Sequence, residues 1–66
     1  MRVVVNGKPI VVPDECSLET LISQLELTPQ GVAAAVNRVV IPRSVRCAHM
    51  LQSSDMVEII QAAGGG

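Results

Sequence analysis

The sequence opens with MRVVVNGKPIVV (residues 1–12), two β-branched runs on either side of Asn6-Gly7. Asn-Gly between apolar runs is the strongest short-range signal for a β-hairpin, because both residues tolerate a positive φ in a type I′ turn. We therefore expect strands over residues 1–5 and 10–12.

An amphipathic helix is expected after this hairpin. Ser17 is suited to begin it, because a serine oxygen can accept hydrogen bonds from the free amides of the first helical turn. Apolar residues then recur at the i, i+3, i+4, i+7 spacing that places them on one face of a helix. They are Leu18, Leu21, Ile22 and Leu25. We expect the stretch TPQG (28–31) to end the helix.

The rest of the chain alternates short apolar runs with turn residues. Further strands are expected over residues 32–36, 39–41 and 56–61. The stretch 45–51 fits neither a strand nor a helix pattern, and we interpret it as a turn with a short bridge.

This order of elements predicts an α+β fold. One amphipathic helix can cover one face of one mixed sheet, giving two layers around a single core. The first and last strands would most simply pair in parallel at the centre, which is the β-grasp arrangement, with four to five strands on one main helix. We expect residues 1–61 to form this domain and residues 62–66 to form a flexible glycine-rich tail.

The composition argues against several classes of function. The 66 residues include no aromatic side chain, and the formal net charge is −1. Nucleic acid is not an expected partner, because the chain offers neither a basic stripe nor aromatic rings for stacking. No apolar run approaches the ~20 residues of a membrane helix. We therefore expect a cytoplasmic protein with no membrane partner.

The sequence shows no catalytic or metal site of its own. His49 is the only histidine and belongs to no recognisable motif with a nucleophile, so we interpret it as an ordinary surface or edge residue. Cys47 lies near it, but two ligands do not make a structural zinc site. We interpret Cys16 and Cys47 as packing residues. We expect the chain not to be an enzyme and to bind no cofactor or metal.

The C-terminal glycines, Gly64, Gly65 and Gly66, are the strongest candidate for a functional segment. Glycine has no Cβ, so such a run can thread a channel too narrow for other residues. Five residues beyond Gln61 span roughly 17 Å when extended. The terminal carboxylate is ionised at neutral pH and is a poor electrophile. Its use as an acyl donor requires activation, most simply as an acyl adenylate made from ATP by a separate enzyme.

Strand alternation also predicts a docking surface. Val4 and Ile60 should face away from the helix. If the first and last strands are neighbours, these two side chains form an apolar patch beside the tail, and exposed apolar patches often mark partner sites. Single exposed aliphatic side chains are also normal, so both interpretations stay open.

Four features together point to a known family. They are the hairpin around Asn6-Gly7, the segment AVNRVVIPR (35–43), the turn ending at Asp55, and the terminal Gly65-Gly66. With these features the chain resembles, over its full length, the ThiS family of sulfur carriers for thiazole formation in thiamine biosynthesis. One departure is Ser53-Ser54-Asp55, where that family often has Asp-Gly-Asp, and this concerns only the turn.

The resemblance implies a ubiquitin-like fold and a covalent role for Gly66. In that family an E1-like adenylating enzyme of the ThiF type uses ATP to adenylate the last glycine. Sulfur from a sulfur-donating enzyme converts the adenylate to a thiocarboxylate, which gives its sulfur to a ThiG-type thiazole synthase. Gly64 and Gly65 would thread the partner's site.

Three alternatives remain. A carrier of the molybdopterin type is one, although those chains tend to be longer and to contain aromatic residues. A ubiquitin-like protein modifier is another, with Lys8 as its sole lysine for building chains on itself. The third is an interaction module with an inert tail.

Overall fold

The computed structural model describes residues 1–61, and the predicted tail, residues 62–66, lies outside the described residues. The elements are β1 (Arg2–Val5), β2 (Lys8–Val11), α1 (Leu18–Gln24), the 3₁₀ helix η1 (Pro29–Gly31), β3 (Val32–Val36), β4 (Val39–Val40), the 3₁₀ helix η2 (Arg43–Ala48) and β5 (Met56–Gln61). The strand predictions are confirmed, with differences only at the ends of elements. The stretch 45–51 agrees with the predicted turn and short bridge, because residues 45–48 belong to the 3₁₀ helix η2 and Met50 forms an isolated β-bridge with Ser17.

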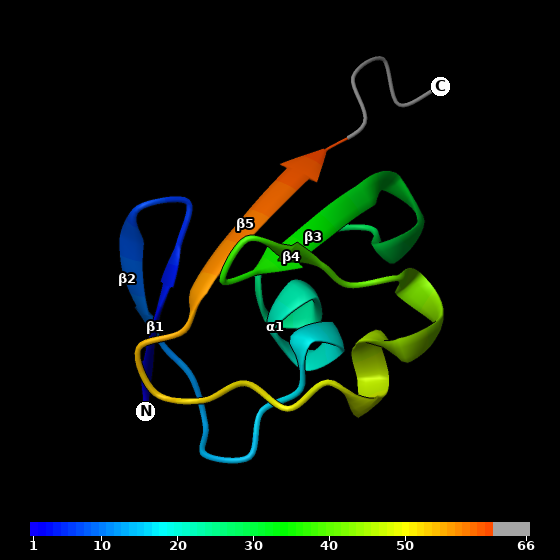
Figure 1. Ribbon diagram of the computed structural model, residues 1–66. Helices are drawn as coiled ribbons and strands as arrows, with labels where there is room; N and C mark the ends of the chain where they lie inside the picture. The colour runs from blue at the N-terminus through cyan, green and yellow to red at the C-terminus, as the bar shows by residue number, and fades with distance from the viewer. Residues whose placement is uncertain (62–66) are drawn as a thin grey trace.

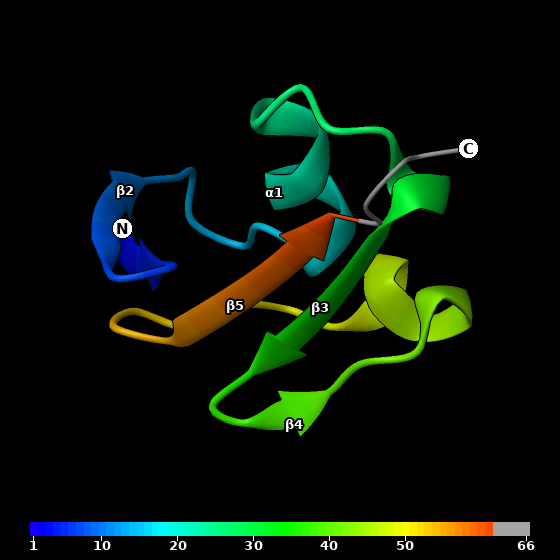
Figure 2. The ribbon, with the colours of Figure 1, turned by 90° about the horizontal axis from the view of Figure 1, so that it is seen from above.

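The five strands form one mixed sheet in the order β2-β1-β5-β3-β4. The first and last strands pair in parallel, with Val4 beside Met56 and Val5 beside Val57, and the other pairs are antiparallel. β5 therefore runs through the middle of the sheet (Figure 1), and α1 lies against one side of it (Figure 2). This is the predicted β-grasp arrangement.

The core lies between α1 and the sheet and is aliphatic. Strand residues that face the helix are buried, as the alternation predicts, and they are Val3, Val5, Ala34, Val36, Val57 and Ile59. α1 contributes Leu18, Leu21 and Ile22, each 0% exposed. Leu25, the fourth residue of the predicted stripe, is only half-buried, because the helix ends just before it.

The start of α1 is capped as predicted. Ser17 has extended backbone angles, and its hydroxyl oxygen accepts a 3.1 Å hydrogen bond from the Thr20 N–H. One otherwise free amide of the first turn is thereby satisfied.

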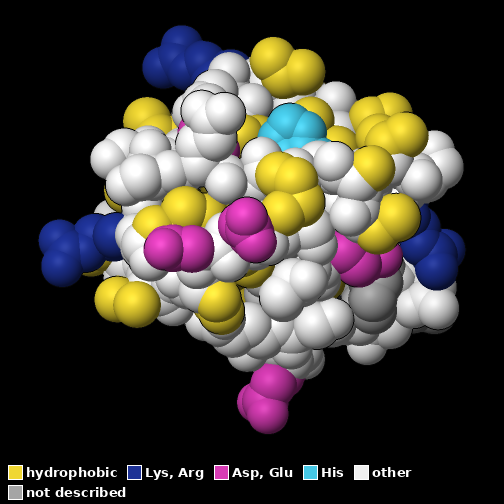
Figure 3. Space-filling model, turned by 90° about the horizontal axis from the view of Figure 1, so that it is seen from below, with side chains coloured by type: hydrophobic (Ala, Val, Ile, Leu, Met, Phe, Trp, Pro, Cys, Tyr) yellow, Lys and Arg dark blue, Asp and Glu magenta, His cyan; other side chains and the backbone are white. Residues whose placement is uncertain are grey.

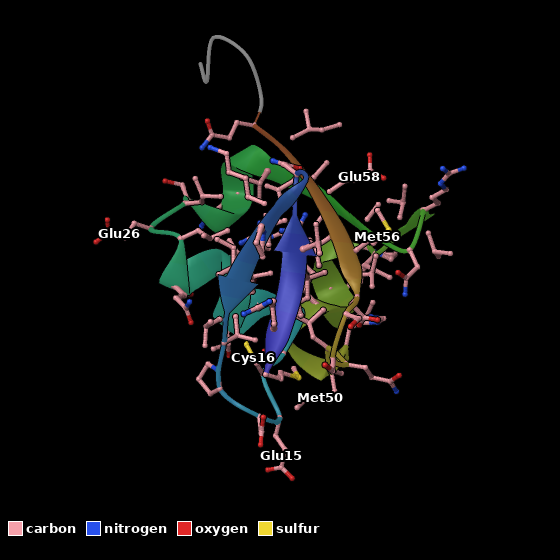
Figure 4. All side chains as sticks on the ribbon, turned by 90° about the vertical axis from the view of Figure 1, so that its left-hand side faces the viewer. Glu15, Cys16, Glu26, Met50, Met56 and Glu58 are labelled. Carbon is pink, nitrogen blue, oxygen red and sulfur yellow. The ribbon has the colours of Figure 1, made fainter. Side chains whose placement is uncertain are left out.

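The end of α1 differs from the prediction. The helix ends at Gln24 rather than at the TPQG stretch, because Glu26 adopts a left-handed φ of 60°. The Glu26 N–H donates to the Ser23 carbonyl oxygen at 2.9 Å, and the Leu27 N–H donates to that of Ile22 at 3.2 Å. This pair of bonds is a Schellman motif, which closes a helix and usually has glycine at the left-handed position. Figure 4 shows the Glu26 side chain pointing away from the core.

Candidate functional site

The predicted reactive residue, Gly66, and the two residues predicted to thread the partner's site, Gly64 and Gly65, all lie outside the described residues. The structure does show the strand that precedes them. The last described residue, Gln61, ends β5 and is paired with Val32 at the start of β3. We call residues 59–61 the tail root.

On the β1 side, a side chain supports the tail root where the neighbouring strand stops. β1 pairs with β5 only as far as Val57, after which the chain turns away at Asn6-Gly7. The Asn6 side chain then bonds the backbone of Ile59. Its amide nitrogen donates to the Ile59 carbonyl oxygen at 3.1 Å, and its amide oxygen accepts from the Ile59 N–H at 2.9 Å.

On the β3 side, a side chain also bonds the backbone next to the tail root, and this side chain is Arg46. β4 pairs with β3 only at Ala35 and Val36, so among residues 1–61 no strand lies beyond the start of β3. Arg46 of η2 is 3% exposed, and its guanidinium donates a 2.6 Å hydrogen bond to the Val32 carbonyl oxygen. The role of Arg46 could not be predicted from the sequence, because nothing in its local pattern distinguishes it from a surface arginine.

Val4 and Ile60 both face away from α1, but they do not form one patch. Val4 is half-buried and lies opposite Met56, whereas Ile60 lies opposite Ala33. Four residues of β5 separate the level of Val4 from that of Ile60, which is roughly 13 Å along a strand. The expectation that the two side chains are neighbours is therefore wrong, and the charged Glu58 lies between them.

The face of the sheet opposite α1, which we call the outer face, is nevertheless rich in apolar side chains. Met56 and Glu58 point away from α1 (Figure 4). The most exposed apolar residues on this face are Val11, Val40, Met56 and Ile60. Ile60, 69% exposed, is the one that belongs to the tail root.

A hollow opens beside the tail root, at the end of the molecule where α1 finishes. Its lining includes Lys8, Ile10, Leu25, Leu27, Ile59 and Gln61. The described residues that line it pair no nucleophile with a base, so the hollow lacks the arrangement that covalent catalysis needs.

The two cysteines occupy different environments. Cys16 is buried, and burial raises the pKa of its thiol, which disfavours the reactive thiolate. Cys47 is exposed, so the expectation that it packs in the core is wrong. The adjacent position in η2 is the buried one, and Arg46 occupies it.

His49, the only histidine, is half-buried, and Figure 3 shows the histidine side chain at the surface. Among residues 1–61, no three histidine, cysteine or acidic side chains gather into a group that could hold a metal ion. No helix of this part of the chain is long and apolar enough to cross a membrane.

Comparison with known proteins gives consistent results. A sequence model described as the ThiS family matches residues 1–66. A thiazole synthase from Magnetococcus marinus is 33% identical over all 66 residues, and the chain spans only 20% of that protein's length. The sulfur carrier protein ThiS of Escherichia coli is 26% identical, with full coverage of both chains. The crystal structure of the thiamine biosynthesis protein ThiS from Geobacter metallireducens superposes with a TM-score of 0.85 at 30% identity, also with full coverage of both chains.

Proposed function

The chain belongs to the ThiS family, and we propose that it is a sulfur carrier protein of thiamine biosynthesis that works through the carboxylate of Gly66. The observation that carries this proposal is the family match, because it extends through residue 66 and so includes the terminal glycines. The fold supports it, since β5 is a firmly paired central strand that leads directly into the segment 62–66.

The proposed chemistry takes place on a partner enzyme. A Gly66 carboxylate oxygen attacks the α-phosphorus of ATP, pyrophosphate leaves, and an acyl adenylate forms. A hydrosulfide equivalent from a sulfur-donating enzyme then attacks the acyl carbon and displaces AMP, which leaves a thiocarboxylate. The carrier itself contributes a folded domain that the partner binds and the carboxylate that reacts. It needs no catalytic side chain and no bound cofactor of its own.

We propose two principal partners, a ThiF-type adenylating enzyme and a ThiG-type thiazole synthase. The second is supported by the Magnetococcus protein, because one fifth of a protein named thiazole synthase is similar to this whole chain. Gly64 and Gly65 would thread the active sites of both partners. Ile60 on the outer face, with Val4 further along the sheet, would contact their surfaces.

The rival classes have less support. A molybdopterin-type carrier would share the chemistry, but the similar proteins are named a thiazole synthase, a sulfur carrier protein ThiS and a thiamine biosynthesis protein. A protein modifier that forms chains would depend on Lys8 alone.

The test is adenylation of the purified protein by its cognate adenylating enzyme, followed as exchange of pyrophosphate with ATP. The parent should support exchange, and intact-mass measurement after sulfur transfer should show one oxygen replaced by sulfur. Deletion of Gly66 should abolish exchange, because the carboxylate then lies about 3.5 Å short and a misplacement of ~1 Å can cost roughly a hundredfold in rate.

A substitution in the tail should fail in the same way. Gly65→Val adds a β-branched side chain where the channel is narrowest. Gly31→Val is the matched control, because a Cβ at Gly31 meets no atom within 4 Å. Exchange at the parental rate by Gly65→Val or by the Gly66 deletion would rule out Gly66 as the working residue.

A further inference from the structure

Asn6 continues the β1–β5 ladder after the backbone of β1 has turned away. Its own N–H donates to the Val57 carbonyl oxygen at 2.9 Å, which is the last backbone bond from this strand. In a continued parallel pair, the Asn6 carbonyl oxygen would accept from the Ile59 N–H, and the Lys8 N–H would donate to the Ile59 carbonyl oxygen. The Asn6 side chain supplies both instead, accepting from the Ile59 N–H and donating to the Ile59 carbonyl oxygen.

Few residues other than asparagine could do this. The position has a left-handed φ of 49°, which asparagine tolerates better than most residues. A side-chain amide is also one of the few groups that carry a donor and an acceptor together. Ile59 is 8% exposed, so its backbone N–H and carbonyl would lose hydrogen-bond partners at a cost if Asn6 were absent.

We infer that Asn6 is a positioning residue for the reactive end of this chain. Ile59 begins the tail root, and Asn6 is the last described group that bonds β5 from the β1 side. By fixing Ile59, it sets the direction in which β5 delivers the residues beyond Gln61 to a partner's active site. This inference rests on the proposed function, and Asn6 itself need not touch the reacting atoms.

The chain provides a matched comparison in Asn37. This residue also follows a strand, has a φ of 51°, and uses its side-chain amide to bind β5. Its oxygen accepts from the Met56 N–H at 3.0 Å, and its nitrogen donates to an Asp55 carboxylate oxygen at 3.1 Å. Asn37 therefore bonds one backbone N–H of β5 at the end away from the tail root, while its nitrogen bonds a carboxylate that precedes the strand.

The experiment compares Asn6→Gly with Asn37→Gly. Glycine accepts the left-handed φ and removes the side-chain bridge, and it adds the same backbone entropy at both positions, so both variants should fold and both should unfold more easily than the parent. Each is assayed for pyrophosphate exchange with the cognate adenylating enzyme, with kcat and KM measured separately. Asn6→Gly should lower kcat at least tenfold with KM within about threefold, because the docking surface is intact while the reactive end is misdirected. Asn37→Gly should keep both constants within about twofold.

Two further measurements keep the inference testable. Hydrogen exchange should accelerate at the Ile59 amide in Asn6→Gly and at the Met56 amide in Asn37→Gly. If Asn6→Gly fails to fold, Asn6→Asp replaces it, because aspartate keeps an acceptor for the Ile59 N–H and loses the donor to the Ile59 carbonyl. Asn6→Asp should lower kcat by a smaller factor than the tenfold expected for Asn6→Gly.

The outcomes separate this inference from the proposed function. Equal kcat values for the parent and Asn6→Gly, or equal losses in the two glycine variants, would overturn the positioning role and leave the carrier role standing. A parent protein that supports no exchange would overturn both.

Discussion

The guanidinium of Arg46 donates a 2.6 Å hydrogen bond to the carbonyl oxygen of Val32, the residue whose strand partner is Gln61. A buried charge therefore holds the start of β3 next to the tail root. We predict that Arg46→Ala lowers the free energy of unfolding by about 1.5–3 kcal/mol, the range for hydrogen bonds to charged groups. Urea denaturation measures this. Arg43→Ala, at an exposed position of the same 3₁₀ helix, should change stability by less than about 0.5 kcal/mol. Equal effects would contradict the role of Arg46.

The left-handed residue after α1 offers a way to stabilise the protein. Glu26 has a φ of 60°, a conformation that costs roughly 1–2 kcal/mol for a residue with a Cβ. Glu26→Gly should therefore raise the free energy of unfolding by about 0.5–1 kcal/mol, part of the gain being offset by backbone entropy. Ser23→Gly, inside the helix, should instead lower it by about 0.5 kcal/mol. Thermal unfolding of both variants checks the opposite signs.

The core contribution of α1 should fall sharply toward its C-terminal end. Leu21→Ala should cost about 2–5 kcal/mol, because the side chain is 0% exposed and its loss leaves a cavity. Leu25→Ala should cost less than about 2 kcal/mol, since that side chain is half-buried and solvent can fill the space. Denaturant midpoints measured in parallel would refute this gradient if the two losses were equal.

The two thiols should react at very different rates. Cys47 is exposed, whereas Cys16 is buried and its thiol has a raised pKa. Because of this raised pKa, Cys16 has less thiolate available for alkylation at neutral pH. Iodoacetamide treatment of the native protein followed by mass analysis should show one rapid addition, at Cys47. The second addition should require denaturant. Cys47→Ser should remove the rapid addition and leave sulfur transfer unchanged, and rapid labelling in that variant would show that Cys16 is accessible.

Ile60 should matter to partner binding because of its place at the tail root. Ile60→Asp should fold normally and weaken binding to the adenylating enzyme or the synthase at least tenfold, as measured by titration calorimetry. Val11→Asp is the control, because Val11 is similarly exposed at 71% and lies on the outer face opposite Arg2, at the other end of the sheet. Similar losses in both variants would indicate a general effect of charge rather than a local contact.

The features that could be predicted from the sequence are those fixed by local chemistry. Asn6-Gly7, the Ser17 cap and the apolar stripe of α1 each act within a few residues. The remainder depends on distant partners. Arg46 is buried because of a carbonyl 14 residues away, and nothing near Glu26 marks its left-handed angle. Alternation gave the correct faces for Val4 and Ile60, but their separation depends on the register between β1 and β5.

The position of β5 has a consequence for how the protein is made. β5 is the last element among the described residues and the middle strand of the sheet. In a nascent chain that lacks it, the remaining strands can pair only as two separate hairpins, β1–β2 and β3–β4, and an isolated hairpin is at best marginally stable in water. Since chains emerge from the ribosome N-terminus first, the sheet closes only after β5 has emerged. A copy truncated before β5 therefore lacks the strand that joins the two hairpins, and limited proteolysis should cleave it faster than the full chain.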